Sequence, residues 1–294
     1  MTSLSRQAVP LRDAHALGSR PTRAQVASAV PGLALLALVL VVPFAWLVWR
    51  SLHAGTVAAG GSFTGIDNYV SVLRSPEWWE AIGTTAVLAL GLTVAQLVLG
   101  VAFTVALWHV TRLWWPARFL ALVPAGVGLI VGAHAGRAAV DGGFLTAWFG
   151  LDGFSAAGAL AGVVLGELWR TTGLVVVLVH AAFEARVPSS LLDAAVADGA
   201  TSWQRWRRVI WPAVAPALAA VASYRLIDSW RLLEGPLLVR EPGSFRTSAS
   251  ALIADNAFGL LSGGPAAAAA VVLVLIPVAV GGIVLGLTQV VRRR

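Results

Sequence analysis

Long runs of apolar residues, separated by short polar segments, dominate this chain from residue 30 onwards. Each run is continuous and lacks the alternation of polar and apolar residues that the strands of a membrane barrel need. Each is also about as long as a helix must be to cross a hydrocarbon core of roughly 30 Å. The runs lie at 30–49, 84–108, 116–135, 156–183, 212–233 and 265–291. The pattern therefore predicts an all-α polytopic membrane protein with six transmembrane helices.

The composition supports a membrane location. Hydrophobic residues make up 58% of the 294 residues and charged residues 12%, with a mean hydropathy of +0.80, whereas a soluble domain carries about 25% charged residues. Six spans and their connections fill the chain, so little is left for a separate soluble domain. The predicted organisation is a tail at 1–29, the first span and an outer loop at 30–83, a five-helix core at 84–291, and a tail at 292–294.

The arginines predict the orientation. The net charge of +7 comes from arginine alone, because the chain has no lysine. If the N-terminus is cytoplasmic, thirteen of the 21 arginines fall on the cytoplasmic side and five on the outer side, so the positive-inside rule predicts a cell-membrane protein with both termini cytoplasmic. The first run could be a cleaved signal peptide, but its length and its terminal Trp46 and Trp49 favour an uncleaved anchor. Because the charges flank apolar runs, we do not expect nucleic-acid binding.

Residues that commonly carry chemistry are scarce. There is no cysteine, and without lysine there is no phosphate-binding P-loop. The five histidines show no metal-ligand spacing. We therefore predict no catalytic residue, no metal site and no enzymatic activity in this chain.

The most informative polar stretch is the 186–212 segment, between the fourth and fifth runs. Pro188 ends the preceding span, Ser190 is expected to cap a short helix with Asp193 three residues later, and Gly199 suits the left-handed position that closes it. Thr201 or Ser202 is then expected to cap a second helix. That helix would place Trp203, Trp206 and Ile210 on one side, and Arg205 and Arg208 on another. The pattern alone fits an interfacial loop or a docking element equally well.

The same segment resembles the EAA loop of ABC-importer permeases. Five residues fall on its pattern, namely Asp193, Ala194, Ala195, Gly199 and Pro212. Asp replaces the usual Glu, Val209 the usual Ile, and Trp211 the usual Leu. In that family the loop seats in a groove of a separate ATPase subunit and transmits its closure to the spans. The resemblance implies a coupling role for Asp193, Ala194, Ala195, Asp198, Gly199, Trp203, Arg205, Arg208 and Pro212.

A second stretch resembles maltose-type sugar permeases. It comprises Phe63-Thr-Gly-Ile-Asp-Asn-Tyr69 and the following Pro76-Glu-Trp-Trp79. The outer loop at 240–248 departs from the family's Thr-x-Gly-Gly-Pro pattern. The resemblance implies import of a sugar or sugar-like solute through a pore shared with a second permease. It also implies two ATPase subunits that bind ATP and magnesium, an extracytoplasmic solute-binding protein, and no cofactor in this chain.

Several ionisable side chains fall inside or at the ends of predicted spans. They are Glu167, Arg170, Tyr224, Arg225, Asp228, Arg231 and Glu234. A charge at the centre of a span costs between about 2.5 and more than 10 kcal/mol, so these groups should face protein or water. Helical spacing allows Glu167 to pair with Arg170, and allows Asp228 to pair with an arginine of its own helix.

Two interpretations of these charges remain open. They can neutralise one another and join helices, or they can line a polar path for a hydroxyl-rich solute. The path candidates are Trp169, Arg170, Tyr224, Asp228, Trp230 and Arg231. An alternative function is an ion- or proton-coupled secondary transporter in which Asp228 or Glu167 is the coupling carboxylate. Glycines within the second and third runs are expected to permit close helix packing, namely Gly91, Gly100, Gly126, Gly128 and Gly132.

Overall fold

The computed structural model describes residues 23–107, 111–126, 129–151, 155–233 and 248–292, and these are mostly helical. The chain divides into two compact units, residues 1–49 and 50–294. The described part of the first unit is residues 23–49 of helix α1 (Arg23–Ser51), whose last two residues belong to the second unit. Its section Val30–Ser51 is long and apolar enough to cross a membrane, as the first apolar run predicts.

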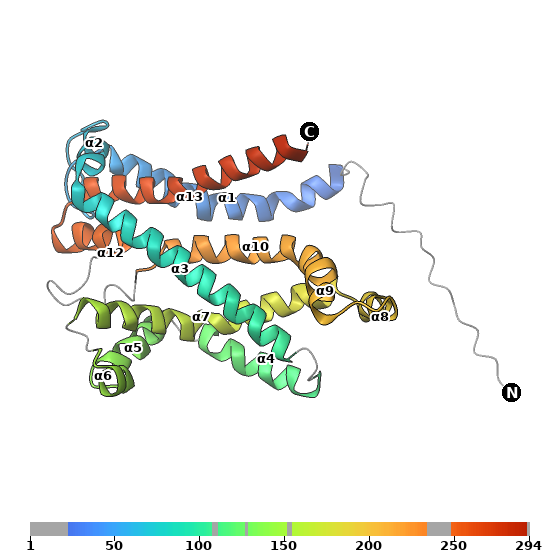
Figure 1. Cartoon of the computed structure of the whole chain (residues 1–294). Helices are drawn as coiled ribbons and strands as arrows, with labels where there is room; N and C mark the ends of the chain where they lie inside the picture. Colours follow the sequence, from blue (N-terminus) through green and yellow to red (C-terminus); the bar gives the residue numbers. More distant parts are fainter. Residues whose placement is uncertain (1–22, 108–110, 127–128, 152–154, 234–247, 293–294) are drawn as a thin grey trace. The chain divides into compact units, whose positions relative to one another are not determined.

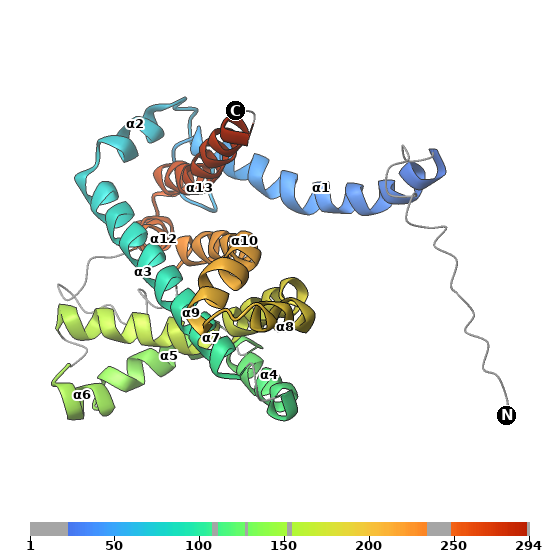
Figure 2. The same ribbon diagram turned by 45° about the vertical axis from the view of Figure 1, so that its right-hand side comes forward.

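The second unit is built from long helices that run between two ends (Figure 1). They are α3 (Pro76–Leu107), α7 (Ala156–Arg186), α10 (Trp211–Trp230) and α13 (Gly263–Arg292). One end carries α8 (Ser189–Ala197), α9 (Ser202–Arg205) and the π-helical turn η3 (Trp206–Ile210). The opposite end carries α2 (Asp67–Arg74), α6 (Phe144–Phe149), α12 (Ala249–Ala254) and the π-helical turn η4 (Asp255–Gly259). Figures 1 and 2 agree on this division.

The predicted third span is not one straight helix. Its residues are shared between α4 (Thr111–Gly126) and α5 (Leu129–Val140). The segments Phe119–Gly126 and Ile130–Phe149 are bent by 94° to each other. Within the described residues four helices are long and apolar enough to cross a membrane, or five if the bent pair counts as one span. The predicted count of six therefore stays a prediction.

Close approach of backbones fixes α5 against α7. A Cβ atom on Gly136 would lie 2.0 Å from the carbonyl oxygen of Gly162, and one on Gly166 would lie 2.5 Å from that of Gly132. Both helices thus present two glycines four residues apart, the small-residue pattern that lets membrane helices touch. Gly132 was among the glycines expected to do so, whereas the other three emerge from the structure.

The remaining glycine predictions have mixed outcomes. Gly100 packs closely, because a Cβ there would lie 3.0 Å from the side chain of Val175. The prediction is wrong for Gly91 and Gly126, where an added Cβ would meet no atom within 4 Å. Each of these two glycines is itself exposed, on a side of its helix that no other described segment approaches. Gly128 lies outside the described residues.

The stretch that resembles sugar permeases forms a hydrogen-bonded corner between the loop after residue 51 and the start of α13. The side chain of Asn68 donates to the carbonyl oxygens of Ser51 and His53 at 2.9 and 3.2 Å. The hydroxyl groups of Tyr69 and Ser51 lie 2.5 Å apart. A Cβ atom on Gly264 would lie 2.8 Å from the Asn68 amide nitrogen. Asn68 thus satisfies the loop backbone in a place too tight for a larger residue at 264.

Candidate functional site

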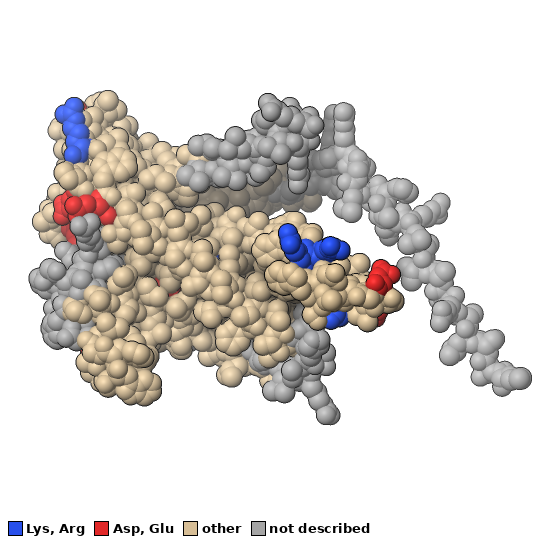
Figure 3. All heavy atoms as spheres, in the orientation of Figure 1, with Lys and Arg blue, Asp and Glu red and all other residues tan. Residues whose placement is uncertain are grey.

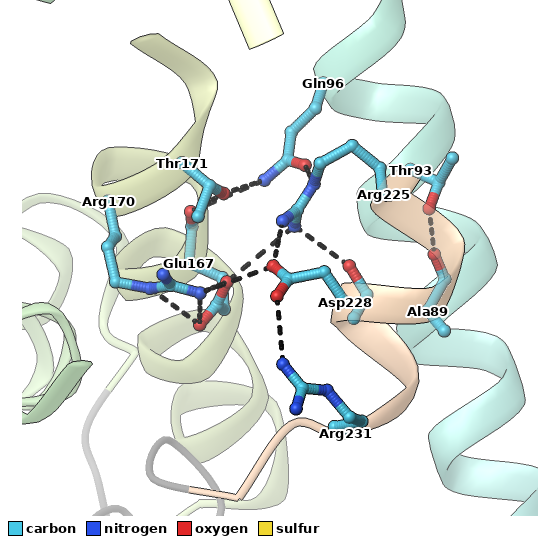
Figure 4. A network of polar contacts seen from close by, with 10 residues as sticks. Ala89, Thr93, Gln96, Glu167, Arg170, Thr171, Arg225, Asp228 and Arg231 are labelled. Atoms are coloured by element: carbon cyan, nitrogen blue, oxygen red, sulfur yellow. Dashed lines mark hydrogen bonds and ion pairs between the residues drawn. The ribbon is translucent and has the colours of Figure 1, made fainter. Parts of the chain in front are cut away.

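A polar network joins three long helices of the second unit (Figure 4). Helix α3 contributes Gln96, α7 contributes Glu167, Arg170 and Thr171, and α10 contributes Arg225, Asp228 and Ser229, followed by Arg231. The residues from each of α7 and α10 are one turn or less apart, so each helix presents its polar groups on a common side. Around them the helices meet through apolar side chains, including Leu88, Leu92, Ala159 and Val163. The network is therefore a polar inclusion in an apolar core.

The inner half of the network is a directed chain of hydrogen bonds. The Nε–H of Arg225 donates to Oε1 of Gln96 at 2.6 Å, and Nε2 of Gln96 donates to the Thr171 hydroxyl at 2.6 Å. That hydroxyl donates in turn to the carbonyl oxygen of Glu167 at 2.7 Å. Because arginine can only donate, it fixes which end of the Gln96 amide faces it. Arg225 and Gln96 are completely buried. These hydrogen bonds give both the oxygen and the nitrogen of the Gln96 side-chain amide a partner.

The outer half of the network consists of ion pairs that become more exposed toward the end of α10. Glu167 receives a bidentate interaction from Arg170, with distances of 3.0 to 3.2 Å. Asp228 forms a short ion pair with Arg225 and lies 3.8 Å from Arg170 and 3.6 Å from Arg231. Side-chain exposure is 0% at Arg225, 23% at Asp228 and 73% at Arg231. Asp228 is therefore the carboxylate of this network that solvent reaches most easily.

The charges of the buried part cancel. Glu167 and Asp228 bring two negative charges, and Arg170 and Arg225 bring two positive charges. Both predicted pairings are confirmed, since Glu167 pairs with Arg170 and Asp228 pairs with arginines of its own chain segment. Mutual neutralisation of this kind is how buried charges are tolerated in a membrane.

Helix α5 supports the position of Arg170. A Cβ atom on Gly132 would lie 3.1 to 3.4 Å from three carbon atoms of the Arg170 side chain. The aliphatic stem of Arg170 therefore rests on the glycine surface of α5 while its guanidinium reaches Glu167. The close contact between α5 and α7 thus extends to the polar network.

The structure separates the three aromatic path candidates. Trp169 lies in a groove between α3, α4 and α7. Trp230 lies in a groove between α10, α12 and α13, where its ring N–H donates to the carbonyl oxygen of Leu273 at 3.1 Å. Tyr224 is 45% exposed on α10. Only Arg170, Asp228 and Arg231 of the six path candidates belong to the network, and Glu234 lies outside the described residues.

Three network members were missed by sequence reasoning. Gln96, Thr171 and Ser229 carry no charge, so a search for intramembrane charges passes over them. The available signal was Gln96, an amide side chain in the middle of the apolar run 84–108. An amide in that setting needs partners from another helix, because its own helix backbone is already paired.

The 186–212 segment folds as two short helices, with one correction at the first cap. Helix α8 begins at Ser189, and the preceding Pro188 is its N-cap residue. The prediction that Ser190 caps this helix is therefore wrong, because the helix starts one residue earlier and Ser190 lies within its first turn. Gly199 adopts the expected left-handed conformation with φ +73°. Thr201 caps α9 in a reciprocal capping box with Gln204.

The second helix of this segment differs from the predicted amphipathic pattern. Trp206 and Ile210 pack against apolar residues of α7 and α10, and the ring of Trp206 lies 6.1 Å from that of Phe183. Trp203, expected on the same side, is 68% exposed. Trp203 lies before the π-helical turn at 206–210, in α9, where residues 201 to 204 are all exposed. Arg205 donates to the Ser202 hydroxyl at 3.0 Å, and Arg208 is exposed.

Comparison with known proteins links this arrangement to a family. No protein-family model matches the chain. A trehalose transport system permease protein of Mycobacterium tuberculosis is 30% identical, over 78% of this chain and 76% of that protein. A trehalose/maltose transport system permease protein of Thermococcus litoralis is 26% identical, over 79% of this chain and 82% of that protein.

Two solved structures have the same fold. The first is a bacterial ABC transporter involved in import of the acidic polysaccharide alginate, with a TM-score of 0.73, 20% identity, and coverage of 91% of this chain and 94% of that one. The second is a bacterial alginate ABC transporter in complex with a periplasmic protein, with a TM-score of 0.71, 18% identity, and coverage of 86% and 90%. The chain thus belongs to the family of sugar ABC-importer permeases and is a multi-pass membrane subunit of an ATP-driven importer for a sugar or sugar-like solute, not an enzyme.

Proposed function

We propose that this chain forms one half of a solute path, with a second permease as the other half. Two ATPase subunits would bind ATP and magnesium on the cytoplasmic side, and an extracytoplasmic protein would deliver the solute. The end that carries α8 and α9 would be cytoplasmic, together with both chain termini. Support comes from the arginine distribution and from the alginate transporter, which was solved in complex with a periplasmic protein. The ion-coupled alternative receives no support from the relatives.

The observation that carries the ATPase-coupling proposal is how the 186–212 segment is attached. Helix α8 and the residues before Arg205 are largely exposed, and α8 protrudes beyond the ends of α7 and α10 (Figure 1). Trp206 and Ile210, in contrast, pack with Phe183 of α7. A force on the exposed part would therefore be passed to two long helices through packed side chains, which move as discrete units.

Cysteine cross-linking tests this proposal directly, because the chain contains no cysteine of its own. A single Asp198→Cys variant would be assembled in the intact importer, with cysteines placed along the groove of the ATPase subunit. We expect a disulfide from position 198 to the ATPase, and labelling of this cysteine by impermeant maleimide only in inside-out vesicles. Labelling from the outside of intact cells would contradict the proposed orientation and the docking role together.

Gly199 should be critical for coupling. Its φ of +73° strains any β-branched residue, although a Cβ would meet no atom within 4 Å. Gly199→Val is expected to lower solute-stimulated ATPase activity at least about tenfold. Backbone strain of about 1 to 3 kcal/mol at this position would change the orientation of α8 relative to α9. Gly199→Asn, which tolerates this conformation, should keep most of the activity. Membrane insertion of both variants should equal that of the parent chain, and normal transport by Gly199→Val would contradict the docking role.

The polar network offers hydrogen-bonding groups that suit a hydroxyl-rich solute. The charges of its buried part cancel, and the exposed Arg231 adds one positive charge beside Asp228. Asp228 is the accessible acceptor. Its Oδ2 contacts Arg225, and its Oδ1 lies 3.6 Å from the exposed Arg231. A sugar hydroxyl that replaced this weak contact would bond to a carboxylate that Arg225 holds in place.

A solute screen with an exposed-residue variant tests this assignment. Arg231→Gln should change the half-saturating solute concentration for ATPase stimulation by about three- to tenfold, because contacts of this kind contribute about 1 kcal/mol. Its melting temperature should match that of the parent, since Arg231 is 73% exposed. In the parent importer, sugars should stimulate ATPase activity. Stimulation by amino acids but by no sugar would refute the carbohydrate assignment.

A further inference from the structure

A stripe of two tryptophans and two arginines remains exposed where the 186–212 segment joins α10. It consists of Trp203, Arg207, Arg208 and Trp211, and its tryptophans are 68% and 48% exposed. Trp206 and Ile210, on the opposite side of the same turns, pack into the protein. Packing within the described chain does not account for the exposed stripe, and the coupling role that the resemblance implies covers only Trp203 and Arg208 of its four residues. Trp211 is also where the sequence departs from the leucine usual in the EAA loop.

The two arginines are unpaired within the part of the chain that the structure describes. The ion pairs formed there involve other arginines and one histidine. The acids of this segment, Asp193 and Asp198, lie on and just after α8, and they form none of the ion pairs found among the described residues. Figure 3 shows a separation at this end of the molecule, with acidic side chains at the protruding tip and basic ones nearer the helix bundle. The stripe is thus a local cluster of positive charge.

The level of the stripe along the helix suits a membrane surface. Helices α9, η3 and α10 are continuous, and Ser202–Trp230 is apolar enough to form a span. Arg207 and Arg208 precede Trp211 by three or four residues, which is about 5 Å along the axis. A polar headgroup layer extends about 5 to 8 Å beyond the hydrocarbon core. With Trp211 at the hydrocarbon boundary, both guanidinium groups would lie among lipid phosphates.

We propose that this stripe binds anionic phospholipid headgroups of the leaflet next to the 186–212 segment. The two guanidinium groups would contact headgroup phosphates while the indole rings lie at the boundary, as arginine and tryptophan do at membrane surfaces. The inference rests on the proposed function only in taking this leaflet to be the cytoplasmic one. Lipid would then hold the base of the 186–212 segment at the level of the membrane surface, while the ATPase contacts its exposed tip.

The test uses full-length chain in nanodiscs of phosphatidylcholine and phosphatidylglycerol, with the lipids bound per chain measured by mass spectrometry after brief delipidation. The parent should retain phosphatidylglycerol preferentially, and R207Q/R208Q should lose this enrichment about 25-fold, given about fivefold per arginine. R207K/R208K should restore it, because the charge is kept. R74Q, which removes an exposed arginine of α2 at the opposite end of the unit, should leave it unchanged.

The outcomes separate lipid binding from ATPase docking. Equal enrichment in the parent and in R207Q/R208Q would overturn the proposal, as would an equal loss in R74Q. R207Q/R208Q combined with Asp198→Cys should still form the cross-link to the ATPase subunit. Loss of that cross-link with phosphatidylglycerol enrichment intact would assign the arginines to the ATPase and overturn lipid binding. A missing cross-link in the single Asp198→Cys variant would contradict the proposed function and leave the lipid result standing.

Discussion

Replacing Arg225 by methionine is expected to lower the free energy of unfolding by about 3 to 5 kcal/mol, the range found when one partner of a buried ion pair is removed. The change leaves the Gln96 carbonyl oxygen without its donor at 2.6 Å and removes the short contact to Asp228. Asp228 would keep only the longer contacts to Arg170 and Arg231. Thermal unfolding of the purified full-length chain, followed by the fraction that stays monodisperse after heating, would measure this loss.

An exposed ion pair of the same chain provides a matched control. Arg137 pairs with Asp141 at 2.7 Å, and both side chains are 41% exposed. Arg137→Met should therefore cost less than about 1 kcal/mol. The double variant Arg225→Met/Asp228→Asn should be less destabilised than the sum of its single changes, because the uncompensated charge is removed. An Arg225→Met chain that melts like the parent would show that the network contributes nothing to the packing of α3, α7 and α10.

Gly136→Val is expected to have an effect of similar size for a steric reason. The new Cβ atom would lie 2.0 Å from the carbonyl oxygen of Gly162, which is backbone and cannot rotate away. Helix α5 must then separate from α7, which costs at least about 3 kcal/mol, the upper end of the usual range for overpacking. Folded yield and melting temperature of the full-length chain would report the separation.

Gly91 provides a control for the Gly136→Val variant. Gly91→Val should leave both measurements close to those of the parent, because a Cβ atom at position 91 meets no atom within 4 Å. Gly136→Val should also weaken solute stimulation in any chain that does fold, since α5 supports the Arg170 side chain at Gly132. A stable Gly136→Val chain with normal packing would contradict the close contact between α5 and α7.

Much of the site could be predicted from local spacing. The Glu167–Arg170 and Arg225–Asp228 pairs are three residues apart, so the helix geometry alone brings them together. The left-handed turn at Gly199 and the Thr201 cap are likewise decided within a few residues. The prediction that Ser190 is the N-cap of the first helix was wrong because several neighbouring residues could start that helix. Small differences in local packing decide which of them does.

The sequence by itself determined that the chain is a helical membrane protein, because continuous apolar runs in lipid can satisfy their backbone only as helices. Its 186–212 segment also resembles the EAA loop of ABC-importer permeases, and the 30% identical relative confirms that family. The tertiary structure decided which helices meet: that Gln96 completes a network with residues 71 or more positions away, and that Gly136 faces Gly162. Such contacts depend on how long helices pack against one another, and the apolar surfaces of membrane helices, nearly uniform in sequence, do not specify that packing locally.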